Sequence, residues 1–404
     1  MADFHQTGVI STFHRLGQLD LERMEKDLES FSLRRPIALV LPMTPVELRS
    51  TAAQTIRENL SQIRYIDEIV ITLGRTAEKD DFLKVREFFA PLPQTHRVIW
   101  ASGPSFSQLY GLLAENDLPV GDDGKGRSAW VAYGYILACQ KCKVIALHDC
   151  DIINHSRELV GRLCYPVASP TIDYVFCKGY YARVTDRMHG RVTRLFVTPL
   201  IRSLEKLFGC QPLLRYLDSF RYPLAGEISM RTDMAGINRI PNDWGLEVET
   251  LAEVYRNYSL RRICQAELTE TYEHKHQALS AEDPKTGLMK MAVDIAKSVF
   301  RNLAIEGIIL SQDAFGTLLI NYQRTAKDMI KRYRDDAAIN GLGFDYHQES
   351  IIAEAFTRAL QMAGQAFFED RLYSPLIPSW NRVISAIPFI LEKIQELVEE
   401  ENSA

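Results

Sequence analysis

The sequence predicts an α/β fold in which a mostly parallel sheet is followed by a helical C-terminal extension. Over residues 36–283, short apolar runs alternate with segments of helical spacing. This alternation is typical of parallel strands joined by right-handed crossovers. From residue 284 onward the strand patterns stop, and long amphipathic stretches follow. We therefore expect an N-terminal helical arm (1–35), an α/β domain (36–283) and a helical C-terminal region (284–404).

The individual elements follow from hydrophobic period and from helix-breaking residues. Strands are predicted at Ile37–Leu41, Asp67–Leu73, Arg97–Ala101, from Val144, at Ile172–Lys178 and at Ile263–Leu268. Helices are predicted at Leu19–Phe31, Val46–Leu60, Ser128–Gln140 and from Gly190 toward Leu207. The C-terminal helices are predicted at Leu288–Ala304, Ser311–Arg334, His347–Phe368 and Trp380–Glu400.

The run that begins at Val144 delivers Asp149 and Asp151 where its hydrophobic pattern stops. Ligands of open α/β sheets gather at the carboxyl ends of strands. Two carboxylates this close favour a cation between them, and oxygen ligands suit Mg²⁺ or Mn²⁺ holding a diphosphate. Such a pair is the DxD signature of nucleotide-sugar glycosyltransferases. By itself it is weak, because a chain this long contains roughly one such pair by chance.

Two loops are candidates for binding a nucleotide. The first predicted strand ends in the segment 42–47, before a helix whose N-terminus can face a phosphate. The second loop, 121–127, is rich in glycine and carries Lys125, so that a phosphate is its natural ligand. A surface turn is the alternative for the second loop. Its spacing differs from that of a Walker loop, which argues against an ATPase.

Three later features are candidates for the rest of a site. Arg191 and Thr193 follow Gly190 at a helix start and can bind an anionic acceptor, although a solvated basic turn fits as well. Glu247 also lies at a helix start, where an acid is usually only a partner of the helix dipole. His274 or His276, just after a predicted strand, can complete a metal site. A surface histidine is the alternative for either one.

Composition narrows the class of protein. The formal net charge of -5 argues against a nucleic-acid binder. No apolar run reaches the length of a membrane span, and the first 30 residues lack a signal-peptide core, so we expect a cytoplasmic protein. The seven cysteines indicate reduced thiols. Cys139 and Cys142 form a lone CxxC pair without a second pair at ligand spacing.

Taken in order, several short motifs resemble those of the retaining glucosyl-3-phosphoglycerate synthases. They are Leu41-Pro42 with Glu47, Gly124-Lys125-Gly126, Asp149-Cys150-Asp151, Gly190-Arg191-Val192-Thr193, Pro223-Leu224-Ala225-Gly226-Glu227, Gly245-Leu246-Glu247 and His274. The resemblance covers about Pro36 to Leu279. It implies a GT-A-type, Rossmann-like catalytic domain that binds UDP-glucose or sometimes GDP-glucose. It also implies transfer of glucose, with retention, to the 2-hydroxyl of 3-phosphoglycerate, giving glucosyl-3-phosphoglycerate for glucosylglycerate synthesis.

The resemblance also implies roles for single residues. The donor would be bound by Leu41, Pro42, Thr44, Glu47, Lys125, Asp149 and Cys150, and the acceptor by Gly190, Arg191, Val192 and Thr193. Asp151 and His274 would hold the divalent ion. Glu247 and Asp149 would be the catalytic residues, with Glu247 at the sugar hydroxyls near the reacting carbon. The segment Ile71-Thr72-Leu73-Gly74-Arg75 lacks the Asp-Ser-Gly-Ser run usual after the second strand, which leaves the choice of UDP or GDP open.

Alternatives to this reading are a related transferase that uses GDP-mannose or another small acceptor, and a sugar-nucleotide-binding protein without turnover. Arg191, Thr193 and Glu247 argue against the second, because a protein without turnover needs no acceptor site. We also expect a homodimer, since the apolar stripes of four C-terminal helices need a partner surface.

Overall fold

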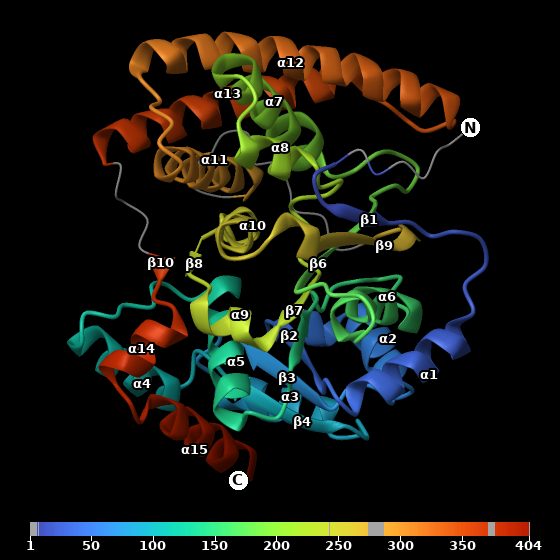
Figure 1. Cartoon of the computed structure of the whole chain (residues 1–404), viewed down its shortest axis with the longest axis vertical. Helices are drawn as coiled ribbons and strands as arrows, with labels where there is room; N and C mark the ends of the chain where they lie inside the picture. Colours follow the sequence, from blue (N-terminus) through green and yellow to red (C-terminus); the bar gives the residue numbers. More distant parts are fainter. Residues whose placement is uncertain (1–5, 7, 242, 274–286, 371–375, 404) are drawn as a thin grey trace.

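The computed structural model describes residues 6, 8–241, 243–273, 287–370 and 376–403. At its centre lies an eight-stranded sheet in the order β1-β9-β6-β7-β5-β2-β3-β4 (Figure 1). Its strands are β1 (Ser11–Phe13), β2 (Ile37–Met43), β3 (Glu68–Leu73), β4 (Thr95–Trp100), β5 (Val144–Leu147), β6 (Phe176–Ala182), β7 (Ile228–Arg231) and β9 (Ile263–Thr271). β7 runs antiparallel to both β5 and β6, and the other pairings in this sheet are parallel. The predicted mostly parallel α/β fold is therefore confirmed.

The central strands are buried on both faces because alternate side chains enter two separate cores. Along β2, Ile37, Leu39 and Leu41 belong to one hydrophobic cluster, whereas Ala38 and Val40 belong to the other. This explains why such strands read as continuous apolar runs. The first core is closed by α1 (Leu21–Ser32), α2 (Thr51–Leu60), α3 (Lys79–Phe89) and α6 (Arg157–Ala168). The second is closed by α4 (Pro104–Glu115), α5 (Lys125–Cys139), α8 (Pro212–Asp218), α9 (Thr232–Ile237) and α10 (Leu246–Asn257).

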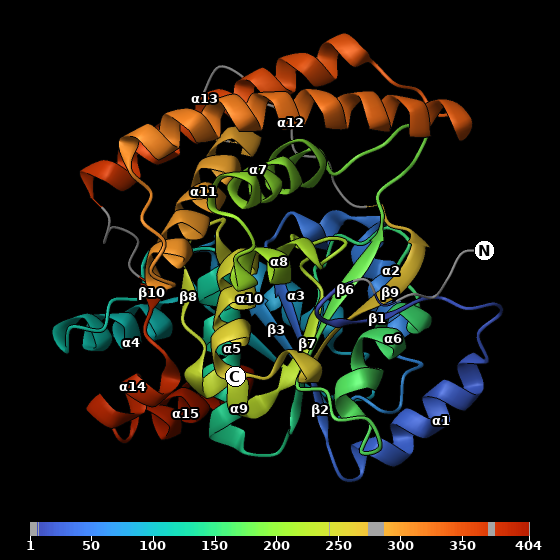
Figure 2. The same cartoon turned by 45° about the horizontal axis from the view of Figure 1, so that its top comes forward.

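A separate layer of helices lies beyond α8 and α10 (Figure 2). It consists of α7 (Thr198–Phe208), α11 (Gly287–Ile305), α12 (Gln312–Ile339) and α13 (Tyr346–Glu369). Its apolar side chains belong to the same hydrophobic cluster as Ala38 and Val40 of the sheet. The layer and the sheet thus share one core, and the boundary at residue 283 stays a prediction.

The last helices leave this layer and return to the sheet. Trp380 opens α14 (Trp380–Ala386), and its ring stacks on Trp130 of α5 with centroids 3.9 Å apart. Its Nε1 donates to the Trp130 carbonyl at 2.9 Å. α15 (Ile390–Ser403) follows and packs on α5 and β4. The prediction of one helix over Trp380–Glu400 is wrong, because Pro388 interrupts it and cannot continue a helical hydrogen-bond ladder.

Three other local predictions are corrected by the structure. The helix predicted over Val46–Leu60 is broken at Ser50, whose Oγ accepts from Ala53 N at 3.2 Å and so begins α2 after a short 3₁₀ turn, η1 (Glu47–Arg49). The strand predicted at Ile172–Lys178 lies four residues later, as β6. The helix predicted from Gly190 opens instead with a π-helical turn, η2 (Val192–Val197), before α7.

Four of the described strands were not predicted, two of them in the main sheet. β1 pairs in parallel with β9 and forms an edge of the sheet, so the predicted N-terminal helical arm also contributes a strand. β7 has only four residues and is too short to show a period. A further short pair joins β8 (Ile240–Pro241) to β10 (Leu376–Ile377).

The apolar stripes of the C-terminal helices are buried within the protomer. Leu318 and Tyr322 of α12 and Phe356 and Leu360 of α13 have no exposed surface. These stripes therefore do not require a second protomer to cover them, and the homodimer remains a prediction. Among the described helices none is both long and apolar enough to cross a membrane.

Candidate active site

Three predicted site residues meet where β5 ends. Lys125 is the first residue of α5, Asp149 follows β5, and Glu247 lies in the first turn of α10. The Lys125 Nζ lies 2.5 Å from Asp149 Oδ1 and 3.5 Å from Glu247 Oε1. Burial acts to lower the pKa of Lys125, but the two carboxylates outweigh it and raise that pKa. The ammonium therefore stays charged and holds two acids from different elements together.

Gly226 lets the turn before β7 approach this group closely. A Cβ atom on Gly226 would lie 2.6 Å from both Asp149 Oδ2 and Lys125 Nζ. Real Cβ atoms do not come so close to such atoms, so no other residue fits here without moving the ion pair. The glycine of the Pro223–Glu227 motif is thus explained by steric exclusion.

Glu227 is a site residue to which the sequence analysis gave no role beyond its place in the motif Pro223–Glu227. Its side chain is fully buried and accepts from Tyr181 Oη at 2.7 Å and Tyr272 Oη at 2.6 Å. The two tyrosine rings stack with centroids 3.7 Å apart. Burial and the neighbouring Asp149 raise the pKa of Glu227, while the tyrosine hydroxyls oppose that rise. In the sequence only its place at the end of the motif Pro223–Glu227 marked it.

Lys178 is the second residue that the sequence analysis missed. It lies within β6, is 1% exposed, and its Nζ has no hydrogen-bond partner among the described residues. Burial lowers the pKa of Lys178 to about 8, although Glu247 and Glu227 act to raise it. In the sequence Lys178 looks like the polar residue that ends a strand. The strand was therefore predicted to end at Lys178, whereas β6 continues to Ala182.

The predicted donor loop is braced from within. Glu47 accepts from the Thr44 backbone N–H at 2.5 Å and also from the Thr44 hydroxyl. Pro42 is half-buried, whereas the side chains of Leu41 and Cys150 are buried in the core around β2. Burial raises the pKa of the Cys150 thiol well above its usual range. Leu41 and Cys150 can therefore offer a ligand only their backbone groups.

The glycine-rich loop is tied to the end of β3 by Asp123. Asp123 accepts from the Arg75 backbone N–H at 2.7 Å and pairs with Arg127 at 3.2 Å. Arg75 has a φ of 57°, an uncommon conformation for a residue other than glycine. This is the segment in which the sequence lacks the Asp-Ser-Gly-Ser run, and Asp123 fixes its conformation instead.

Asp151 is half-buried two residues beyond Asp149, and His274 and His276 lie outside the described residues. Within the described part of the chain, no cluster of three His, Cys, Asp or Glu side chains is placed to hold a metal. Mg²⁺ usually takes only one or two carboxylates, together with substrate phosphates and water. Asp151 in this position fits that coordination, with the diphosphate of a donor supplying the further oxygen atoms.

The predicted acceptor turn is held by the C-terminal layer. Arg191 Nε lies 3.2 Å from Glu349 Oε1, and Arg194 Nη1 lies 2.9 Å from Glu349 Oε2. Glu349 is a buried residue of α13. Thr193 is also buried, and its hydroxyl has no hydrogen-bond partner in the described part of the chain. Val192 points into the core, so that only its backbone can meet a ligand.

Two aromatic rings connect this turn with the acid cluster. Gly190 has a φ of 69°, which favours glycine, and a Cβ there would lie 3.5 Å from Tyr222. The Tyr222 ring lies 5.2 Å from that of Tyr181, which donates to Glu227. The acceptor turn therefore borders the same site as Asp149 and Lys125.

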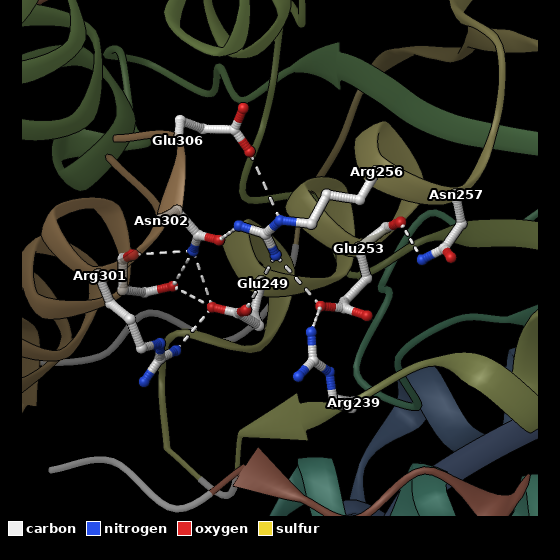
Figure 3. Close-up of polar contacts among 9 residues, drawn as sticks. Arg239, Glu249, Glu253, Arg256, Asn257, Arg301, Asn302 and Glu306 are labelled. Carbon is white, nitrogen blue, oxygen red and sulfur yellow. Dashed lines mark hydrogen bonds and ion pairs between the residues drawn. The ribbon is translucent and has the colours of Figure 1, made fainter. Parts of the chain in front are cut away.

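The helix that carries Glu247 is anchored to α11 by a network of charged and amide groups (Figure 3). The fully buried Glu249 accepts from Ser298 Oγ at 2.9 Å, Arg301 Nη2 at 2.6 Å and Asn302 Nδ2 at 2.9 Å. Further along α10, Arg256 Nε lies 3.6 Å from Glu306 Oε1, just beyond the end of α11. These contacts fix the position of α10, and with it the carboxylate of Glu247.

The fold and this site define a nucleotide-sugar glycosyltransferase of the GT-A type. A glucosyl-3-phosphoglycerate synthase of Persephonella marina is 47% identical over 403 residues, which is 100% of both chains. One of Methanococcoides burtonii is 36% identical over 400 residues, or 98% of this chain and 96% of the relative. The chain belongs to the family of glucosyl-3-phosphoglycerate synthases. No protein-family model matches it.

Solved structures of a more distant relative share the fold. The glucosyl-3-phosphoglycerate synthase of Mycobacterium tuberculosis in complex with Mn²⁺, UDP-glucose and phosphoglyceric acid has a TM-score of 0.53 at 21% identity, covering 75% of this chain and 89% of that one. Its complex with Mg²⁺ and UDP gives a TM-score of 0.52 at 21% identity and the same coverage.

Proposed function

We propose that the protein transfers glucose, with retention, from a nucleoside-diphosphate glucose to the 2-hydroxyl of 3-phosphoglycerate. UDP-glucose is the favoured donor and GDP-glucose the second choice. The observation that carries the proposal is the convergence of Lys125, Asp149, Glu227 and Glu247 at one end of the sheet. Carboxylates and ammonium groups of this kind match the hydroxyls and phosphates of a sugar nucleotide. The relatives named for this reaction, and the UDP-glucose and phosphoglyceric acid in the solved complexes, support it.

We further propose that a divalent ion, Mg²⁺ or Mn²⁺, is held by Asp151 and by His274, with His276 as the alternative. Such an ion would stabilise the charge that develops on the departing diphosphate. The Mg²⁺ and Mn²⁺ in the relative's complexes support this assignment. Asp149 is engaged with Lys125, and we assign it to the donor and not to the ion.

For the donor, we assign the nucleoside to the loop of Pro42, Thr44 and Glu47, with Leu41 and Cys150 contributing backbone groups. Lys125 would then neutralise part of the negative charge of the diphosphate. Asp149, Glu227 and Glu247 would accept hydrogen bonds from glucose hydroxyls. Because these acids are fixed by ion pairs or tyrosine hydroxyls, little reorganisation is required when the sugar binds.

For the acceptor, we assign the phosphate and carboxylate of 3-phosphoglycerate to the turn Gly190–Thr193. The Nε of Arg191 faces Glu349, and among the described residues its terminal guanidinium nitrogens make no hydrogen bond, so they can bind a planar anion. The buried Thr193 hydroxyl adds a donor. Retention is then achieved by front-face displacement, in which the departing phosphate accepts the proton of the acceptor hydroxyl. Glu247 is the alternative, as a carboxylate nucleophile close to the anomeric carbon.

The test is a coupled assay for released nucleoside diphosphate, with 3-phosphoglycerate present and absent. We expect release from UDP-glucose only when the acceptor is present. GDP-glucose and GDP-mannose in parallel reactions identify the base and the sugar. A rate that does not depend on 3-phosphoglycerate would point to another acceptor. Binding of the donor without turnover under any condition would favour the non-catalytic alternative.

A further inference from the structure

Lys178 stands out among the buried residues because its charge is not matched by a described hydrogen bond. A buried ammonium without hydrogen-bond acceptors is costly. The ammonium of Lys125, by contrast, lies against Asp149 and Glu247. The ammonium of Lys178 therefore has hydrogen-bond donors that no described protein group uses.

The register of β6 decides where this lysine points. Side chains alternate along a strand, so Lys178 lies on the same face as Phe176, which belongs to the core that α10 covers. The charges that act on Lys178 are those of Glu247, Glu227, Lys125 and Asp149. In the sheet Lys178 pairs with Ile228, the residue after Glu227, and the Gly179 N–H donates to the Glu227 carbonyl at 2.9 Å. The buried Lys178 therefore lies beside the acid cluster of the candidate active site.

Charge selects among the possible ligands. Three carboxylates already act on Lys178, and Lys125 is the other cation in this group. A phosphate or carboxylate placed here would add negative charge to a net negative cluster in a buried position. A sugar hydroxyl is neutral, and it can accept from the ammonium while it donates to a carboxylate.

We propose that Lys178 donates a hydrogen bond to a hydroxyl of the glucosyl group that the enzyme transfers. The proposal rests on the function proposed above and adds a sugar-binding residue to it. Lys178 thereby binds the sugar of the donor but neither its diphosphate nor the acceptor. Discrimination between glucose and other hexoses is a consequence, because a site that bonds a hydroxyl rejects an analogue that lacks it or points it elsewhere.

The experiment compares the affinities of K178M for UDP-glucose and for UDP, measured by calorimetry in the presence of Mg²⁺. We expect the dissociation constant of UDP-glucose to rise about tenfold or more, as for a lost hydrogen bond to a charged group. The dissociation constant of UDP should stay within about twofold, and so should the Michaelis constant for 3-phosphoglycerate. The matched control is K143M, which changes an exposed lysine and should alter neither affinity.

Each other result overturns the assignment. An equal loss of UDP and UDP-glucose affinity would indicate that Lys178 binds the diphosphate or has only a structural role. A raised Michaelis constant for 3-phosphoglycerate alone would indicate that Lys178 binds the acceptor. If neither affinity nor this constant changes, Lys178 does not contribute to substrate binding. If K178M does not fold, the same comparison in K178Q decides, with a smaller loss confined to UDP-glucose. Failure of the wild type to bind UDP-glucose would instead contradict the proposed function.

Discussion

The donor side and the acceptor side of the candidate site are built in different ways. Asp149 lies two residues after the end of β5 at Leu147, and Lys125 opens the helix that precedes that strand, so the donor side is made by the sheet and its connections. On the acceptor side, Arg191 and Arg194 are held by Glu349, which lies more than 150 residues further along the chain on α13. Donor binding should therefore tolerate changes in the C-terminal layer that acceptor binding does not.

Glu247 is the exception to this division. It contributes to the donor side through Lys125, yet α10 is anchored to α11 of the C-terminal layer through Glu249 (Figure 3). The layer thus reaches both sides of the site, but by different contacts. The five predictions below test the division, from the largest expected effect to the smallest.

Removal of the metal ligand should have the largest effect. D151A should lower turnover by roughly three orders of magnitude, because the charge on the departing diphosphate loses several kcal/mol of stabilisation. Turnover is measured across Mg²⁺ and Mn²⁺ concentrations. H274A should show the same loss, and a loss in H276A alone would move the ligand by two positions. Unchanged rates in D151A and in both histidine variants would remove the metal assignment.

The next largest effect should come from G226A on the donor side. The added methyl group would displace the Lys125–Asp149 pair, and a displacement of about 1 Å at a reacting centre can cost roughly 100-fold in rate. The value of kcat/KM for the donor is the measurement. G111A is the matched control, because no atom lies within 4 Å of a Cβ at that position of α4. Normal activity in G226A would contradict the steric argument.

R191A should affect the acceptor alone. Loss of a charged hydrogen bond to a bound anion costs about 2–5 kcal/mol, or about thirtyfold or more in affinity. The Michaelis constant for 3-phosphoglycerate should rise accordingly, while UDP-glucose binding, followed by calorimetry without acceptor, stays unchanged. R187A, at an exposed arginine in the preceding loop, is the control. A collapse of donor affinity would assign the Gly190 turn to the nucleotide.

E349Q should give a smaller effect on the same side. The amide keeps the shape of Glu349 but weakens its hold on Arg191 and Arg194, so we expect the Michaelis constant for 3-phosphoglycerate to rise about threefold to tenfold. The thermal midpoint should also fall, because the guanidinium of Arg194 is largely buried. E354Q, at an exposed position of α13, is the control. A change in donor affinity would break the division between the two sides.

The predicted homodimer should have the smallest effect on the site. Sedimentation at micromolar concentration should show a species larger than one protomer, with Ile320 and Ile339 as the exposed apolar residues that α12 can offer. I320K should weaken that association and leave kcat unchanged, since α12 contributes none of the assigned residues. A monomeric wild type would contradict the predicted homodimer and would leave the proposed catalytic roles unaffected.

Much of the donor side could be predicted from the sequence because it is local. A strand that ends at two acids, or a glycine-rich loop that opens a helix, shows its geometry in a few neighbouring residues. Lys125, Asp149 and Glu247 are brought together as a result of the α/β order itself. Lys178 and Glu227 were missed or undervalued because burial is a property of packing. A lysine inside a strand and one at its end look alike in a sequence.

The sequence by itself determined the α/β class, the succession of most strands along the chain and the resemblance to the family, since apolar period and short motifs are encoded residue by residue. Only the tertiary structure decided that Pro388 splits the last helix, that β1 joins the sheet and that Glu349 holds Arg191. It also decided which carboxylates surround Lys178. The physical reason is that charge pairing, desolvation and steric exclusion depend on distances between atoms that lie far apart in the chain.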